Sequence, residues 1–287
     1  MKNIPKVQYQ GRDKKVGFEM FPLENLVNID IPNNHNPFQP HRIDFFAILF
    51  LTSGAVEHTL DFKKYHLTPY DCLVISKGQV HSFDSVHKYK GFLILFTEDF
   101  LEINISKSTI NNISKIYNYH IFGSKYKVEK ESIEIFNLLN KEQKEKNHNL
   151  KPNIVASLLS AFLLKLENHN QKEPFKATYN HQYDLFVCFE KNLEKYFSEN
   201  RNAKFYAEKQ NITYKHLNEV CKQFSNKSAK EFIDDFIILE AKRQLSSTNL
   251  SVKEIAYYCG FDEVTNFQKY FKKITAETPI SFRQKFQ

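Results

Sequence analysis

The sequence predicts a two-domain α+β protein: an antiparallel β-barrel with following helices, then an all-helical domain with two helix-turn-helix units joined by a linker helix. Two patterns indicate this. Residues 43–97 contain short β-branched and aromatic runs separated by turn residues, whereas helical spacing of apolar residues dominates after residue 98. A chain of 287 residues, 41% of them hydrophobic, is long enough for two cores.

The barrel is expected to occupy about residues 20–100. Turns are predicted at Ser53-Gly54, Thr68-Pro69 and Lys77-Gly78, because glycine and proline interrupt extended runs. The strands predicted between them are residues 43–51, 55–62, 72–76, 81–83 and 92–97. Helices over about 101–168 complete a first domain, residues 1–170.

A long apolar stripe marks the helix expected at 151–167. It comprises Ile154, Val155, Leu158, Leu159, Phe162, Leu163 and Leu166. Either the stripe packs on the barrel of its own chain or two such helices form a dimer interface, and the sequence leaves both open. The polar segment 171–182 contains Pro174 and lacks periodicity, which predicts a linker before a helical domain at 183–287.

Local capping chemistry marks helix starts in that second domain. Ser228 with Glu231, and Ser251 with Glu254, have the spacing of capping boxes, in which serine and glutamate satisfy each other's free amides. After Ser251 the residues Val252, Ile255, Ala256 and Cys259 share one helix face, and Gly260 suits the left-handed turn that ends the helix.

A second helix is expected from an N-cap at Asp262, with Val264, Phe267, Phe271 and Ile274 inward. The pair forms a helix-turn-helix whose second helix is polar and basic, as the major groove requires. Its predicted DNA-contacting residues are Glu263, Thr265, Asn266, Gln268, Lys269, Lys272 and Lys273.

An equivalent unit lies about fifty residues earlier, with a support helix at 203–209 and a reading helix capped by Thr213. Leu217, Val220, Cys221 and Phe224 are expected inward. The predicted DNA-contacting residues are Thr213, Tyr214, Lys215, His216, Asn218 and Lys222, while Glu219 shares their exposed face. The linker helix at 228–246 would be about 28 Å long. Because one duplex turn is about 34 Å, both reading helices can enter successive major grooves.

These residues resemble the AraC/XylS family of bacterial transcription regulators. The resemblance is carried by Ile255-Ala-Tyr-Tyr-Cys-Gly-Phe261, Phe267, Phe271-Lys-Lys273, Thr278-Pro279 and Phe282-Arg283. Two positions depart from the family pattern, Cys221 in place of phenylalanine and Ala276 in place of glycine. The segments 46–54, 78–81 and 91–96 resemble the family's cupin-like sensor domain.

The resemblance implies a sequence-specific DNA-binding regulator, an activator by the family's usual mode. Its expected partners are promoter DNA, a second copy of the chain in a homodimer, and RNA polymerase if it is an activator. The barrel either senses a small-molecule effector, whose identity the sequence does not give, or only dimerises without one. Lys215 and Asn218 correspond to positions that commonly touch bases. Glu219 stands where the family often has a basic or polar residue that contacts bases. It therefore either accepts a hydrogen bond from a cytosine amino group or weakens DNA binding.

His41, His58 and His81 are candidates for a ligand pocket in the barrel. With Glu57 or Asp61 they also suggest a metal-dependent cupin enzyme with a helical appendage, as an alternative function. The spacing of metal-binding cupins is incomplete here, and the resemblance implies a sensor without metal. We therefore expect no cofactor, no metal and no catalysis, and the sequence contains no GxSxG, phosphate loop or paired helix histidines.

Charge and cysteine usage fit a cytoplasmic protein. The net charge of +7 is compatible with a polyanionic partner, and residues 264–287 carry five Lys or Arg against one acidic residue. Cys72, Cys188, Cys221 and Cys259 form no CxxC pair, so we expect buried thiols rather than disulfides. The longest apolar run is too short for a bilayer, which predicts no membrane partner.

Overall fold

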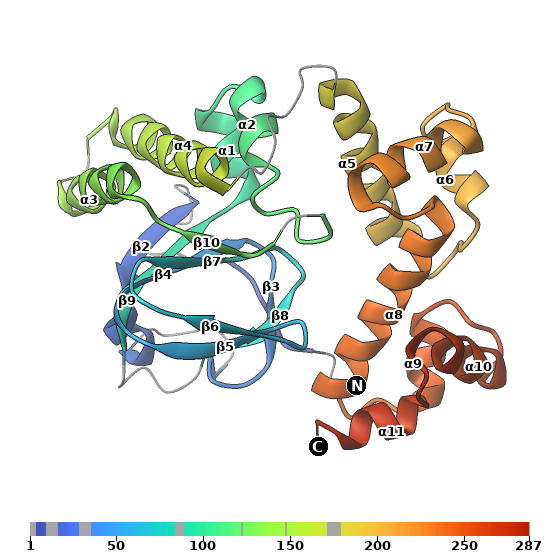
Figure 1. Cartoon of the computed structure of the whole chain (residues 1–287). Coiled ribbons are helices and arrows are strands. Elements are labelled where there is room, and N and C mark those ends of the chain that lie inside the picture. The colour runs from blue at the N-terminus through green and yellow to red at the C-terminus, as the bar shows by residue number, and fades with distance from the viewer. Residues whose placement is uncertain are drawn as a thin grey trace. The chain divides into compact units, whose positions relative to one another are not determined.

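The computed structural model describes residues 4–9, 17–28, 36–83, 89–121, 123–146, 148–170 and 179–286. The chain forms two compact units, an N-terminal unit (Pro5–Pro174) and a C-terminal unit (Phe175–Gln287, with Ile4). Figure 1 shows sheets and a few helices in the first unit and helices alone in the second. Each unit is described by itself below.

Two five-stranded sheets face each other in the N-terminal unit (Figure 1). One has the order β1-β3-β8-β5-β6 and the other the order β10-β7-β4-β9-β2. The strands are β1 (Lys6–Val7), β2 (Phe18–Pro22), β3 (His41–Ile43), β4 (Phe46–Gly54), β5 (Val56–Leu60), β6 (Lys63–Leu67), β7 (Asp71–Ile75), β8 (Val80–Ser82), β9 (Tyr89–Phe96) and β10 (Lys125–Lys127).

Strand β4 is buried on both faces, which explains its continuous apolar run. Ala47, Leu49 and Leu51 contribute to a core with Val56 and Leu60 of the opposite sheet. Alternate residues of β4, among them Ile48 and Phe50, contribute to a second core shared with the helices of this unit. The strand is therefore central to both packing layers, because side chains alternate along a strand.

The strand predictions hold in outline and fail in detail. The expected strand 43–51 is divided between β3 and β4 by a bend at Asp44 and Phe45. The expected strand 55–62 ends at Leu60, because Asp61 and Phe62 adopt left-handed backbone angles that turn the chain into β6. Strands β1 and β10 fall outside the predicted barrel, and β2, at its start, and β6 were not predicted, because such short segments carry little periodicity.

The helices of the N-terminal unit are η1 (Leu23–Asn28), α1 (Glu98–Asn104), α2 (Lys107–Ile113), α3 (Lys130–Lys144) and α4 (Lys151–Asn170). Helix α4 carries the predicted apolar stripe, of which Val155, Leu159, Phe162, Leu163 and Leu166 are buried against the sheet and its neighbouring helices. The stripe therefore packs within its own chain. Ile154 is 37% exposed, so one end of the stripe reaches solvent.

The C-terminal unit consists of seven described helices. They are α5 (Tyr179–Tyr196), α6 (Ala203–Lys209), α7 (Tyr214–Ser225), α8 (Ala229–Ser247), α9 (Val252–Tyr258), α10 (Val264–Thr275) and α11 (Pro279–Gln284). Helix α5 begins at Tyr179, so the end of the predicted linker at 182 and the start of the domain at 183 were too late. The rest of that linker, 171–178, lies outside the described residues.

The cysteines are free thiols, and three of them are buried as expected. Cys188 on α5 is exposed, which corrects the expectation of four buried thiols. Within the part of the chain that the structure describes, no helix is long and apolar enough to cross a membrane.

Candidate nucleic-acid interface

The first helix-turn-helix comprises α6, a turn and α7. Helix α6 has the predicted bounds, and α7 begins after the predicted cap at Thr213. Asn202 caps α6 by accepting a hydrogen bond from the Lys204 amide, and Thr213 caps α7 by accepting one from the His216 amide at 3.1 Å. Asn211 in the turn has φ +54°. Leu217, Val220 and Cys221 are buried beneath α7 as expected.

The predicted DNA-contacting residues on α7 differ in how far they are exposed and in whether they bond other protein groups. Tyr214, at the first position of the helix, is 40% exposed, and Lys215 and Lys222 are exposed. His216 is half-buried, and its Nδ1 lies 3.8 Å from the Glu219 carboxylate. Thr213 is committed to its capping role through its hydroxyl. The outward part of this helix therefore consists of Tyr214, Lys215, Glu219 and Lys222.

Asn218 has a structural role that the sequence did not predict. Its side-chain oxygen accepts a hydrogen bond from the Ala229 amide at 2.8 Å. Ala229 is the first residue of α8, so Asn218 satisfies one of the four amides that a helix start leaves without an intrahelical acceptor. This bond joins the first reading helix to the linker helix and uses the acceptor that adenine recognition would require.

The second helix-turn-helix comprises α9, a turn at Gly260 and α10. The Ser251–Glu254 capping box forms as predicted, and Gly260 has φ +76°. A side chain at this glycine would collide with backbone, because a Cβ built there would lie 2.2 Å from the Ser198 carbonyl oxygen. Glycine is therefore required at this turn for two reasons: the backbone angle is left-handed, and the loop that precedes α6 leaves no room for a side chain.

The N-cap of α10 is Glu263, not the predicted Asp262, and its side chain makes no capping bond. Val264 is only partly buried and Ile274 is 36% exposed, so two of the four residues expected beneath this helix are not fully covered. Phe267 and Phe271 carry the packing. Each of these two rings buries a large apolar area.

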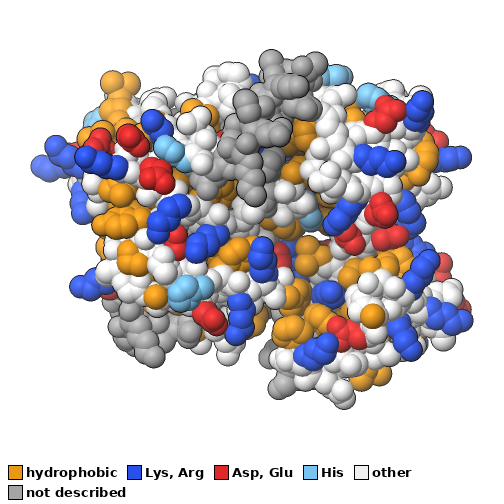
Figure 2. All heavy atoms as spheres, viewed as in Figure 1, with side chains coloured by type: hydrophobic (Ala, Val, Ile, Leu, Met, Phe, Trp, Pro, Cys, Tyr) orange, Lys and Arg blue, Asp and Glu red, His pale blue; other side chains and the backbone are white. Residues whose placement is uncertain are grey.

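The outward face of α10 is basic. Thr265, Asn266, Lys269, Lys272 and Lys273 are exposed, Gln268 is half-buried, and Glu263 at the helix start is exposed. In Figure 2 the part of the surface that belongs to α9, α10 and α11 shows more Lys and Arg than acidic side chains. A polar helix with three lysines matches the phosphate-lined major groove.

Three polar links hold α9, α10 and α11 on α8. The Tyr270 hydroxyl donates to Asp234 Oδ1 at 2.7 Å, and burial followed by this hydrogen bond raises the pKa of Tyr270. Arg283 donates to the carbonyl oxygens of Leu245 and Leu250. The Tyr270 bond joins α10 to the linker helix, and the Arg283 bonds join α11 to the linker helix and to the loop that follows it.

The third link is a buried ion pair on α8. Arg243 and Glu240 are 1% and 3% exposed, their Nη1 and Oε1 atoms lie 2.5 Å apart, and the Tyr258 hydroxyl of α9 donates to the same carboxylate at 3.1 Å. Sequence analysis missed these residues. Charged residues spaced i, i+3 on a helix expected to be amphipathic were the only signal.

The structure brings the three candidate pocket histidines together. His41 on β3, His58 on β5 and His81 on β8 are buried, and their ring centroids lie 4.3 Å apart for His41 and His81 and 5.5 Å apart for His58 and His81. Phe83 closes one side, 5.4 Å from both His58 and His81. Val56 and Leu60, which flank His58 at alternate positions of β5, belong to the core between the sheets.

This cluster has no metal-binding arrangement. Among the residues described, no three His, Cys, Asp or Glu side chains are placed to hold one ion. The carboxylates that were candidates for a metal triad are used elsewhere: Glu57 pairs with Lys64 at 3.2 Å, and Asp61 accepts from the Val80 amide and from Gln79. The histidines therefore form part of an interior lined by imidazole and aromatic rings.

Comparison with known proteins identifies both halves. A helix-turn-helix domain model matches residues 206–285, and a model of the AraC-like ligand binding domain matches residues 29–125. The chain belongs to the AraC/XylS family. It is therefore a DNA-binding transcription regulator whose N-terminal half is a ligand-binding domain of the AraC type.

Relatives of this AraC-family chain match it over most of its length. The HTH-type transcriptional activator RhaR of Mannheimia succiniciproducens is 22% identical over 268 residues, covering 92% of this chain and 93% of that protein. RhaR of Yersinia pestis is also 22% identical, covering 87% and 86%. A structure of ToxT from Vibrio cholerae with a bound unsaturated fatty acid is 13% identical, covers 86% of this chain and 89% of that chain, and has a TM-score of 0.43.

The two departures from the family pattern have local explanations. Cys221 is fully buried beneath α7, where a smaller side chain leaves the helix in place, and burial raises the pKa of its thiol to about 12. Ala276 ends α10 with φ +62°, an angle that favours glycine. This AraC-family chain therefore carries backbone strain at a position where the family pattern has none.

Proposed function

We propose that the chain activates transcription by binding a bipartite promoter site through α7 and α10. The supporting observation is the arrangement of two amphipathic helices, each with a polar outward face, at the two ends of one nineteen-residue linker helix. A helix of that length spans about 28 Å, so the reading helices suit major grooves about 34 Å apart on one face of the duplex.

Within this proposal, Lys215 on α7 and Gln268 and Lys269 on α10 reach base edges, whereas Lys222, Lys272 and Lys273 meet phosphates. Lysine can donate to guanine and glutamine can pair with adenine in the major groove. Lysines toward the C-terminal part of each reading helix lie farther from the groove floor, because it is the N-terminal residues of such helices that enter. Thr213 and Asn218 position the helices rather than read bases.

The test is selection of the full chain against random duplex DNA, with sequencing, at two salt concentrations. We expect one enriched motif with two short contacted blocks about one helical turn apart, bound more weakly at the higher salt. Binding that is sequence-blind at both concentrations would contradict the proposal. In vitro transcription from a promoter bearing the motif then checks activation, which requires contact with RNA polymerase.

We also propose that the N-terminal unit binds a small polar effector beside His41, His58 and His81. Imidazole nitrogens both donate and accept hydrogen bonds, so they suit hydroxyl or carboxylate groups of a ligand whose apolar part contacts Phe83. Thermal-shift screening of sugars and small carboxylates should find a compound that stabilises the wild type but not His58→Ala. A screen in which both proteins respond equally would place the effector elsewhere.

A homodimer completes the proposal, and α4 is the candidate interface. Its buried stripe is occupied within its own chain, but Ile154 and Leu164 are each 37% exposed. Apolar side chains at that exposure suit a helix that also contacts a second copy. Sedimentation velocity should show a dimer that Leu164→Asp weakens. A wild-type monomer at all concentrations tested would contradict it.

A further inference from the structure

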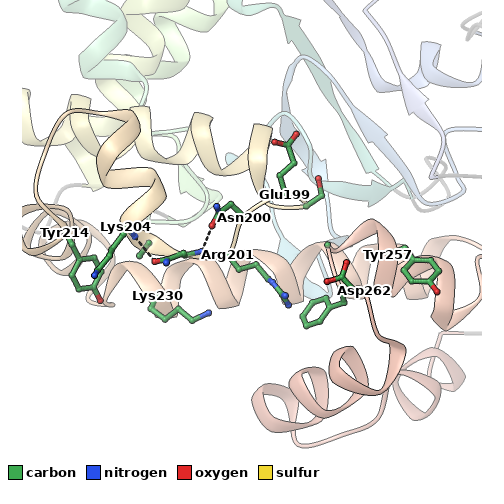
Figure 3. A pocket seen from close by; sticks show the side chains of 13 residues that line it. Glu199, Asn200, Arg201, Lys204, Tyr214, Lys230, Tyr257 and Asp262 are labelled. Carbon is green, nitrogen blue, oxygen red and sulfur yellow. Dashed lines mark hydrogen bonds between the residues drawn. The ribbon is translucent and has the colours of Figure 1, made fainter.

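A polar hollow with a volume of about 960 Å³ lies in the C-terminal unit, between the two helix-turn-helix units (Figure 3). It is lined by the loop from α5 to α6, by the first turns of α6, α7 and α8, and by the end of α9 with the turn that follows. Its charged lining residues are Glu199, Arg201, Lys204, Lys230 and Asp262.

The hollow extends from the start of one reading helix to the start of the other. Tyr214 is the first residue of α7, and Asp262 immediately precedes the N-cap of α10. If α7 and α10 enter successive major grooves, the duplex between them must pass in front of the surface that joins their N-terminal ends. The lining of the hollow therefore faces the sugar-phosphate backbone that separates the two grooves.

The cations of the hollow suit that backbone. Lys204 is exposed in the first turn of α6, and the Arg201 guanidinium carbon lies 3.8 Å from the centroid of the Phe261 ring. A guanidinium stacked on a ring by its face directs its N–H groups outward in its own plane, where phosphate oxygens can accept them. Lys230 forms an ion pair with Asp234, so it contributes less charge to a ligand.

Neighbouring side chains hold Arg201 and Lys204 in place. Asn200 accepts a hydrogen bond from the Asn202 amide at 2.8 Å, and Asn202 accepts one from the Lys204 amide at 3.0 Å (Figure 3). Glu199 lines the hollow too, but in Figure 3 its carboxylate points away from the row formed by Arg201, Lys204 and Lys230. Arg201 on the loop and Lys204 in the first turn of α6 thus extend from an ordered backbone, to either side of Lys230 in the view of Figure 3.

We infer that Arg201 and Lys204 form a backbone seat: a site that binds the phosphates of the DNA segment between the two contacted blocks, independently of its sequence. The size of the hollow favours a duplex backbone over a single free anion, since it is far larger than one phosphate group. This inference rests on the proposed function. It adds two phosphate contacts outside both reading helices.

The test measures how binding of the selected duplex depends on salt, using the full chain and the variants Arg201→Gln, Lys204→Ala and the double variant. Each lost phosphate contact should reduce the slope of log K against log salt by about 0.9. We expect about that reduction for each single variant and about twice that for the double. Affinity should fall by the same factor for the selected and for unrelated sequences, with the motif unchanged.

Two control variants keep the result interpretable. Lys195→Ala removes an equal charge from α5 outside the hollow and should leave the slope unchanged. Arg201→Lys keeps the charge and should retain most of the slope, which separates charge from the packing of Arg201 on Phe261. Thermal melting of each variant checks that the fold is intact.

The backbone seat is overturned if the folded double variant keeps the wild-type slope, or if its motif changes. It is also overturned if Lys195→Ala lowers the slope as much as Lys204→Ala, since the effect would then be one of net charge. Failure of the proposed function looks different: the wild type itself would select no motif, and Lys269→Ala would leave its binding unchanged.

Discussion

The two helix-turn-helix units share a plan but differ in their turns and in the charge of their outward faces. In the first, the turn is made by Asn211, Asn218 is committed to α8, and Glu219 lies among the outward residues. In the second, the turn is made by Gly260 next to Ser198, and the outward face of α10 carries three lysines, with the exposed Glu263 at its start. Charge favours the second unit as the main source of affinity.

The two units are also joined to the linker helix α8 by different bonds. The second unit is tied to α8 by Tyr270 and Asp234, by Arg283, and by the Tyr258 hydroxyl on the Glu240–Arg243 pair. The first is joined to α8 by the hydrogen bond from the Ala229 amide to Asn218. Both units are therefore held on the linker helix by side-chain hydrogen bonds.

The largest change in the free energy of unfolding is expected for substitutions at the turns. Gly260→Ala places a Cβ against the Ser198 backbone and imposes a left-handed angle on alanine, so it should lower the free energy of unfolding by roughly 3 kcal/mol or more. Asn211→Gly in the first unit should change it by less than about 0.5 kcal/mol, because asparagine already tolerates that angle. Urea denaturation followed by far-UV circular dichroism measures both, and equal losses would remove the distinction between the turns.

Next in size is the difference between the reading lysines. Lys269→Ala should weaken binding of the selected site by roughly tenfold, about 1.4 kcal/mol, and relax preference at one base position. Lys215→Ala should cost roughly threefold, since the first unit contributes less. Affinities of both variants for the selected DNA site and for sites with one mismatch separate the loss of a base contact from the loss of charge attraction to phosphates. A larger loss of affinity for Lys215→Ala than for Lys269→Ala would contradict a larger contribution of the second unit to affinity.

A smaller effect is expected where the reading helices end. Ala276 closes α10 with φ +62° and Asn226 closes α7 with φ +57°. Ala276→Gly should raise the free energy of unfolding by about 1 kcal/mol, because glycine adopts that angle without strain. Asn226→Gly is the matched control and should gain less. Destabilisation by Ala276→Gly would show that the methyl group packs usefully.

The smallest effect concerns the carboxylate on α7. Glu219→Gln should raise affinity for all sequences by roughly threefold, because a negative charge beside phosphates opposes binding. Glu208→Gln on α6, an exposed carboxylate outside the reading helix, serves as the control and should change affinity less. If Glu219 instead accepts from a cytosine, the substitution would lower affinity and relax one base position.

Much of the C-terminal unit could be predicted because its signals are local. The capping boxes at Ser228 and Ser251 and the glycine turn depend on residues within a few positions, and all three formed as expected. Asp262 was predicted as an N-cap on residue type alone, and the chain instead begins α10 one residue later. Residue type favours a cap but does not fix the backbone angle there.

What could not be predicted depends on contacts between distant segments. Asn218 bonds Ala229 eleven positions away, and Tyr270 bonds Asp234 thirty-six positions away. No periodicity encodes such pairs. Likewise β10 exists because Lys125–Lys127 pairs with β7, and its three residues alone carry no strand signal. The histidine cluster was suggested by residue type, but only the pairing of β3, β5 and β8 brings the rings together.

The most direct test of the central claim is hydroxyl-radical footprinting of the full chain on its selected site. Two reading helices in successive major grooves should protect the backbone in patches about 10 base pairs apart, all on one face of the duplex. Lys269→Ala should weaken the patches nearest the block read by α10 more than the others. One continuous patch short of a helical turn, or protection on both faces, would contradict reading by α7 and α10 together.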